Sequence, residues 1–243
     1  MLRQRRGDDG LMNESVIVAL DMDAHSALGL ARSIAGHVRY LKVGMTLFYA
    51  EGPLIVARLR DLGFDVFLDL KLHDIPHQVE GAAREVARLG VSMFTVHASG
   101  GREMMAAAVR GACEGSAECG ADTPDVLAVT VLTSLSAQAL GDVGVGRPPD
   151  AQVALLGKLA REAGVQGVVC SPHEAAAMRG LMGPEALVVT PGVRPAGSES
   201  ADQARVATPA DALASGASHL VIGRPITGAS DPVTALNHIL EEL

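Results

Sequence analysis

The chain of 243 residues has no tryptophan, four phenylalanines and two tyrosines. Proteins that bind nucleic acid without sequence preference stack bases on aromatic side chains and neutralise phosphates with lysine and arginine. This chain has few such aromatic platforms, and its formal net charge is −8. We therefore expect no nucleic-acid partner. A local group of Arg and Lys side chains can still bind an anionic small molecule.

The chain also lacks the features of a disulfide-stabilised, zinc-binding or membrane protein. Its three cysteines, Cys113, Cys119 and Cys170, form an odd set without zinc-site spacing. No apolar run reaches the roughly 18 residues of a membrane span. The first dozen residues are charged and contain no apolar segment of the kind found in signal peptides. We expect a cytoplasmic protein with reduced thiols and no membrane partner, in which residues 1–13 form a disordered tail.

From residue 15 onward, short apolar runs alternate with helix-like segments. The predicted strands are 16–21, 40–43, 66–70, 93–97, 126–131, 167–170, 187–190 and 219–222. The predicted helices include 53–62, 78–89, 101–113, 151–163, 172–180 and 209–215. Eight such units predict an α/β fold, a single (β/α)8 TIM barrel over residues 14–243. An open doubly wound sheet is the alternative, but no G-x-G-x-x-G follows the first strand.

Polar side chains gather at one end of these predicted strands, the carboxyl end. They are Asp21, Lys42, Asp69, Lys71, His97, Thr133, Ser134, Arg194 and Arg224. In a barrel these strand ends meet at one mouth, which holds the active site of barrel enzymes and often binds phosphate after strands 7 and 8. Polar residues with a purely structural role would occur at both strand ends. We therefore expect an active site at this mouth.

The segment Asp69-Leu70-Lys71-Leu72-His73-Asp74-Ile75 directly follows the apolar run of the third strand. Asp69 and Lys71 would share one face of the strand, and burying both is costly unless partners or a substrate compensate. Together with Lys42 and Asp74 the charges sum to zero, which allows a shared low-dielectric pocket. The flanking carboxylates favour the charged form of Lys71, so it reads as a proton donor and not as a Schiff-base nucleophile. A structural salt bridge is the simpler alternative.

The polar residues at the same mouth also allow two further chemistries. A metal site built from Asp21, Asp69 and His97 remains open, although lysines on either side would compete for these carboxylates. The second is phosphate binding, because glycine lets the backbone approach closely and Arg224 in Gly223-Arg224-Pro225 offers bidentate contacts. The segment 192–203 is long enough to form a closing lid.

Taken in order, the motifs resemble the orotidine 5′-phosphate decarboxylase family, of the bacterial type, over residues 16–236. The resemblance is carried by Ala19-Leu20-Asp21, Leu41-Lys42-Val43-Gly44, Asp69-Leu70-Lys71-Leu72-His73-Asp74-Ile75-Pro76, Val96-His97-Ala98, Val131-Leu132-Thr133-Ser134, Pro191-Gly192-Val193-Arg194-Pro195, Asp202-Gln203-Ala204-Arg205 and Val221-Ile222-Gly223-Arg224-Pro225. It implies a lyase, free of metal and cofactor, that converts orotidine 5′-phosphate to UMP and CO2 in pyrimidine synthesis.

The resemblance also implies a role for each matching residue. Asp21 and Lys42 would hold the ribose hydroxyls, Asp69 would lie against the substrate carboxylate, and Lys71 would protonate C6. The remaining substrate-binding residues of the same subunit would be His97, Thr133 or Ser134 for the pyrimidine, Gln203 between pyrimidine and phosphate, and Arg194, Gly223 and Arg224 on the phosphate side.

A homodimer is implied as well, with Asp74 contributed to each site by the partner subunit. Ile75 and Gln78 would accompany Asp74 across the interface. The family usually has threonine at the position of Gln78, which leaves the detail of this contact open. Three alternatives for the whole chain remain: a Mg²⁺-dependent sugar-phosphate decarboxylase or hexulose-phosphate synthase of the same fold, a non-catalytic barrel that binds a phosphate ligand, and a Schiff-base aldolase.

Overall fold

The computed structural model describes residues 12–194 and 207–243. Residues 1–11 of the predicted tail, Gln203 and most of the predicted lid lie outside these ranges. Asn13, which was assigned to the tail, is already the first residue of a strand. The barrel therefore begins one residue earlier than the sequence indicated.

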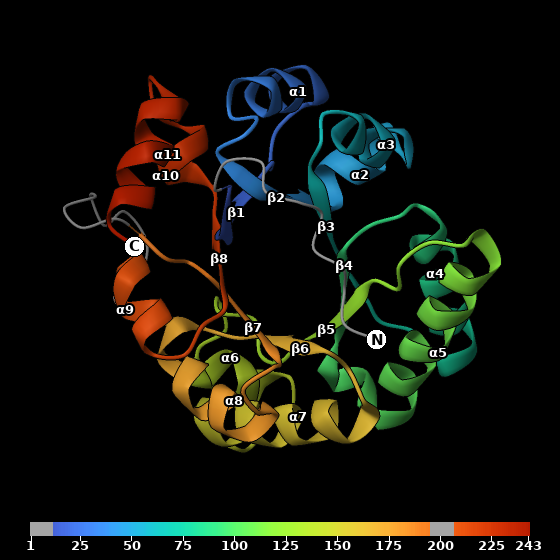
Figure 1. The fold of residues 1–243 in the computed structure, drawn as a ribbon. Coiled ribbons are helices and arrows are strands. Elements are labelled where there is room, and N and C mark those ends of the chain that lie inside the picture. The colour runs from blue at the N-terminus through green and yellow to red at the C-terminus, as the bar shows by residue number, and fades with distance from the viewer. Residues whose placement is uncertain (1–11, 195–206) are drawn as a thin grey trace.

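The described chain forms a closed barrel of eight parallel strands in sequential order, β1 to β8, surrounded by helices (Figure 1). The strands are β1 (Asn13–Ala19), β2 (Val38–Gly44), β3 (Asp65–Leu72), β4 (Met93–His97), β5 (Asp125–Val129), β6 (Gly167–Val169), β7 (Leu187–Pro191) and β8 (His219–Ile222). The predicted TIM barrel is confirmed, and the bounds of β4 and β8 match the prediction at both ends. The largest deviation is in β1, which begins three residues before and ends two residues before the predicted range 16–21, and β3 runs two residues past its predicted end at residue 70.

The helices lie on the outside of the ring of strands (Figure 1). They are α1 (Ala24–Ser33), α2 (Met45–Glu51), α3 (Leu54–Asp61), α4 (Pro76–Arg88), α5 (Gly101–Cys119), α6 (Ala137–Asp142), α7 (Pro149–Ala163), α8 (Ala175–Met182), α9 (Pro209–Ala214), α10 (Arg224–Thr227) and α11 (Pro232–Glu241). Among helices in the described ranges, none combines the length and apolar character needed to cross a membrane.

Side-chain alternation along the strands divides the core in two. Apolar residues that point into the barrel include Ile17, Tyr40, Phe67 and Met93, and they pack together. The intervening residues join the larger core between the strands and the helices. On β3 the inward set continues from Phe67 to Asp69. The same alternation that fills the barrel with apolar groups thus brings charged groups to its carboxyl end.

Helix starts fix the backbone just beyond the strand ends. The Asp23 side chain caps α1 by accepting a hydrogen bond from the Ser26 amide, and Gly44 is both the last residue of β2 and the N-cap of α2. Pro76 opens α4, immediately after Asp74 and Ile75. The connections between these strands, which carry site residues, and the helices that follow them are therefore short.

Helix α4 is held tightly against α5. A Cβ at Gly111 or Gly115 would lie 2.1 or 2.3 Å from the carbonyl oxygens of Glu80 and Arg84, so glycine permits the close approach. Ion pairs across this contact include Arg84–Glu114 and Arg110–Glu80. Because α4 starts two residues after Asp74, this packing anchors the segment that carries Asp74.

Candidate active site

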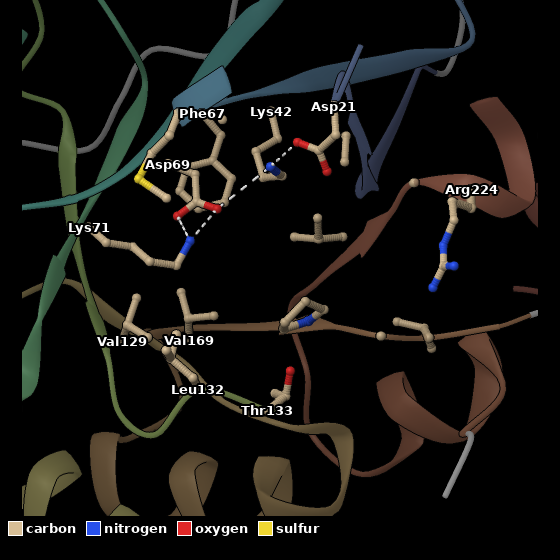
Figure 2. A pocket seen from close by; sticks show the side chains of 18 of the residues that line it. Asp21, Lys42, Phe67, Asp69, Lys71, Val129, Leu132, Thr133, Val169 and Arg224 are labelled. Carbon is tan, nitrogen blue, oxygen red and sulfur yellow. Dashed lines mark hydrogen bonds and ion pairs between the residues drawn. The ribbon is translucent and has the colours of Figure 1, made fainter. Parts of the chain in front are cut away.

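Four alternating charges form a connected line at the carboxyl end of β1, β2 and β3 (Figure 2). Lys42 Nζ lies 2.9 Å from Asp21 Oδ1 and 3.6 Å from Asp69 Oδ2. Lys71 Nζ donates to both Asp69 oxygens, at 2.8 and 2.9 Å. Asp69 therefore lies between two ammonium groups, and the predicted contact between Asp69 and Lys71 is present.

Burial makes these charges depend on one another. Lys42 is 8% exposed, and the Asp69 side chain is 14% exposed. Desolvation acts to raise the pKa of Asp69, but the charges of Lys42 and Lys71 and the hydrogen bonds from Lys71 and Thr95 outweigh it. The pKa of Asp69 is consequently lowered from its usual value of 3.8, and the group is a carboxylate at neutral pH.

Lys71 has an unusual backbone conformation. Its φ is +54°, which makes it the one non-glycine residue with positive φ in the described ranges. A non-glycine residue in this region costs about 1–3 kcal/mol, and such residues cluster at functional sites. The pairing of β3 with β4 is also irregular here, because Leu68 pairs with Phe94 while Leu72 pairs with Val96. Four steps along β3 thus match two along β4, and Lys71 lies in the resulting bulge.

These charges open into a pocket of about 480 Å³, a volume typical of small-molecule sites. Of the predicted site residues, those that line it are Asp21, Lys42, Asp69, Lys71, Thr133, Arg194, Gly223 and Arg224. Arg224 lies across the pocket from Lys71 (Figure 2). Apolar groups such as Phe67, Val129, Leu132 and Val169 line the space between. The pocket therefore suits an anion whose central part contacts apolar side chains.

Five described residues predicted for the site do not line this pocket: Asp74, Ile75, Gln78, His97 and Ser134. His97 lies at the end of β4 with its ring 5.4 Å from that of His73. Burial lowers the pKa of His97, and His73 and Lys71 lower it further. Asp74, Ile75, Gln78 and Ser134 are exposed on the surface of the subunit. Gln203 lies outside the described residues.

Sequence reasoning missed two residues that contact the charged line. Thr95 on β4 donates a hydrogen bond to Asp69 Oδ1, at 2.9 Å. Gly44 lies so close that a Cβ there would be 2.9 Å from Asp21 Oδ1 and 3.0 Å from Lys42 Nζ. Strand alternation could have indicated Thr95, because it lies two residues from both Met93 and His97, which share its face of β4.

The geometry of the charged line does not fit a metal centre. Within residues 12–194 and 207–243, no three His, Cys, Asp or Glu side chains are grouped so that they could hold an ion. Asp21 and Asp69, considered above as ligands, are both bonded to lysine ammonium groups. In the described residues these two carboxylates are therefore engaged in ion pairs with lysine.

The fold and the site together define a TIM-barrel protein with a charged pocket at the carboxyl ends of its strands, the usual position of a barrel active site. The chain belongs to the orotidine 5′-phosphate decarboxylase / HUMPS family, whose model matches residues 14–239. The orotidine 5′-phosphate decarboxylase of Anaeromyxobacter sp. (strain K) is 54% identical over 228 residues, which cover 93% of this chain and 97% of that protein. The enzyme of the same name from Moorella thermoacetica is 50% identical, covering 95% and 92%.

Solved structures agree with these relatives. The orotidine 5′-phosphate decarboxylase of Lactobacillus acidophilus superposes with a TM-score of 0.83 and 40% identity, covering 95% of this chain and 99% of that chain. An uncharacterised protein from Geobacillus kaustophilus has a TM-score of 0.82 at 41% identity, covering 93% and 99%. The predicted family is confirmed.

Proposed function

We propose that this protein decarboxylates orotidine 5′-phosphate to UMP and CO2 in pyrimidine nucleotide synthesis, with Lys71 as the proton donor. The observation that carries the proposal is the position of Lys71, which is bonded to Asp69 at one end of a pocket that has Arg224 across from it. A phosphate bound at Arg224 would direct the other end of the nucleotide toward Lys71. Curated relatives at 50% identity or more carry this enzyme name.

The proposed reaction needs only the residues of the site and water. The bond between C6 and the carboxyl carbon breaks, CO2 leaves, and the electron pair remains on C6. The ammonium of Lys71 stabilises this carbanion and then donates a proton to C6, which forms UMP. The amine of Lys71 regains its proton from water. Lys42, whose Nζ lies 3.6 Å from Asp69 Oδ2, takes no part in this transfer.

Repulsion between Asp69 and the substrate carboxylate would contribute a limited part of the rate. At ~4 Å and an effective dielectric near 20, two like charges repel by roughly 4 kcal/mol. Full relief of this repulsion gives about three decades of rate. Decarboxylation therefore also needs stabilisation of the carbanion by Lys71 and binding energy from the remote phosphate group.

The direct test follows the loss of orotidine 5′-phosphate absorbance in protein treated exhaustively with EDTA. Because two lysines already balance the carboxylates, activity should be unchanged by the chelator and by added Mg²⁺. Lys71→Ala measured in parallel should be inactive, which controls for a contaminating enzyme. Activity that is lost on chelation and restored by Mg²⁺ would favour the sugar-phosphate branch that shares this family model. Trapping with borohydride in the presence of substrate would reveal the Schiff-base alternative.

We further propose that the protein acts as a homodimer in which Asp74 completes the site of the partner subunit. Three observations support this. Asp74 does not line the pocket of its own described chain, and its carboxylate accepts a hydrogen bond from the Ile75 amide at 2.6 Å. Ile75 is 62% exposed, although isoleucine is among the residues most often buried in folded proteins. Packing of α4 against α5 anchors this exposed segment. Gln78, in the first turn of α4, would face the same partner.

Mixed dimers test the shared site. Lys71→Ala and Asp74→Asn should each be nearly inactive as homodimers. Their heterodimer has one site with both lesions and one intact site, so subunit exchange should restore up to about half the wild-type activity per heterodimer. Lys71→Ala mixed with Asp69→Asn is the control, because both residues belong to one subunit's site and every heterodimer site keeps one lesion. Equal activity in both mixtures, with heterodimers shown to form, would place Asp74 in its own subunit.

We also propose that the enzyme is cytoplasmic. The three cysteines are unpaired in the structure. Burial raises the pKa of the Cys170 thiol to about 12, and the charge of Glu174 adds to the shift, so this thiol is unreactive. Cell fractionation followed by the absorbance assay would test this location.

A further inference from the structure

Thr95 is a fully buried polar residue in contact with two groups of the proposed reaction. It is 0% exposed and lies in β4, on the strand face that points into the barrel. Its hydroxyl donates to Asp69 Oδ1 at 2.9 Å and accepts from the Lys71 backbone amide at 2.9 Å. One oxygen atom therefore joins the side chain of Asp69 to the backbone of Lys71.

The irregular pairing of β3 and β4 explains why a side chain makes this bond. Between Leu68 and Leu72 the bulge removes Lys71 from regular pairing with β4. The Lys71 amide would then be a part-buried donor without a partner from the β4 backbone. Thr95 lies opposite the bulge, between the paired residues Phe94 and Val96, and its hydroxyl takes the place of the missing carbonyl.

The same bond restrains a strained conformation. Lys71 has a φ of +54°, which a lysine adopts only where its surroundings hold it. The conformation directs the ammonium back onto the carboxylate two residues earlier, at 2.8 Å. The Thr95 hydroxyl bonds the backbone amide of Lys71 and the carboxylate of Asp69. It therefore restrains both residues that form this contact.

We propose that Thr95 is a positioning residue, whose hydroxyl holds Asp69 and the left-handed backbone of Lys71 in the arrangement that the proton transfer needs. The inference rests on the proposed decarboxylation but goes beyond it, since Thr95 does not line the pocket and acts through Asp69 and the Lys71 backbone. A hydroxyl suits this position because one bond requires a donor and the other an acceptor. Valine has nearly the same shape and offers neither.

The test compares Thr95→Val and Thr95→Ser with a matched control, Thr130→Val. Thr130 is also buried and does not line the pocket, and its hydroxyl donates to the Val169 carbonyl at 3.0 Å. Thr95→Val should lower kcat by roughly 10- to 100-fold, because a small misplacement of a reacting group has effects of this size. KM and the Kd of UMP should change less than about threefold, since the phosphate contacts are on the other side of the pocket. Thr95→Ser should recover most of kcat, and Thr130→Val should match the wild type.

Equal kcat for Thr95→Val and Thr130→Val would overturn the proposed role of the Thr95 hydroxyl. A Thr95→Ser variant as slow as Thr95→Val would also overturn it, because the methyl group and not the hydroxyl would then be the feature that matters. Where thermal unfolding shows that Thr95→Val does not fold, Thr95→Ala replaces it, and the ratio of kcat between serine and alanine variants carries the same comparison. A wild-type protein without activity on orotidine 5′-phosphate would instead refute the proposed function.

Discussion

His219 should make the stability of the barrel depend on pH, although it lies at the end of the barrel opposite the pocket. It is the first residue of β8, its ring contacts the Tyr40 ring edge-on at 5.4 Å, and its Nδ1 lies 2.9 Å from the Ser218 hydroxyl. Burial lowers the pKa of His219 from 6.5 to about 4. Protonation of this ring in the folded protein is therefore unfavourable.

The neighbouring charges act in both directions. Glu14 opposes the shift, whereas Arg179 and Arg39 add to it. Between pH 6.5 and 4 the unfolded chain binds a proton at His219 that the folded protein does not bind. Stability should therefore fall as pH decreases through this window, and it should be unaffected by His219 above the window. A folded pKa of about 4 gives a loss of about 2.5 kcal/mol between pH 7.5 and pH 4.5.

The prediction is checked by urea unfolding of the wild type and of His219→Asn at pH 7.5, 6.5, 5.5 and 4.5. Asparagine keeps a polar atom near Ser218 but does not titrate. The free energy of unfolding of the wild type should fall by about 2.5 kcal/mol more than that of the variant, which is about 5–10 °C in Tm for a chain of this size. Asp69 titrates below 3.8, outside this range, and His97 affects both proteins equally. Parallel pH profiles for the two proteins would refute the reasoning.

Two further predictions concern the pocket. Arg224→Ala should raise KM and also lower kcat by at least about tenfold, because phosphate binding contributes to the reaction as well as to affinity; steady-state kinetics with an unchanged kcat would contradict this. Gly44→Ala should lower kcat/KM by at least about tenfold while remaining folded, because its Cβ would displace the flexible ends of Asp21 and Lys42. Gly81→Ala, where a Cβ meets nothing within 4 Å, is the control, and equal kcat/KM for the two alanine variants would show that the pair tolerates displacement.

The barrel and the gathering of charges could be predicted because both follow from local pattern. Apolar runs of four to six residues that alternate with helical segments allow few topologies for a parallel sheet. In a barrel, the carboxyl ends of the strands meet at one mouth, however far apart they are in the sequence. Lys42 and Asp69 are far apart in the chain, yet their charged groups are 3.6 Å apart. The contact between Asp69 and Lys71 was predicted from a regular strand, but the structure forms it through a bulge.

Features that depend on non-local pairing could not be predicted in the same way. The bulge in β3 exists only relative to β4, so nothing in residues 65–72 alone reveals it. Strand alternation could have placed Thr95 on the inward face of β4, but its hydrogen bonds to Asp69 and to the Lys71 amide depend on the bulge. Helices α6 and α10 have six and four residues, too short for a periodic pattern. The location of Asp74 in an assembly depends on a second chain.

The charges within one chain suggest what the second subunit would add. Asp21, Lys42, Asp69 and Lys71 already sum to zero and are bonded in a line. On the proposed shared site, Asp74 from the partner would bring an additional negative charge close to Lys71. The bound substrate carboxylate would then face an excess of negative charge that its departure as CO2 relieves. Dimer formation would therefore do more than complete the pocket, because it would raise the electrostatic free energy of the bound carboxylate relative to the products.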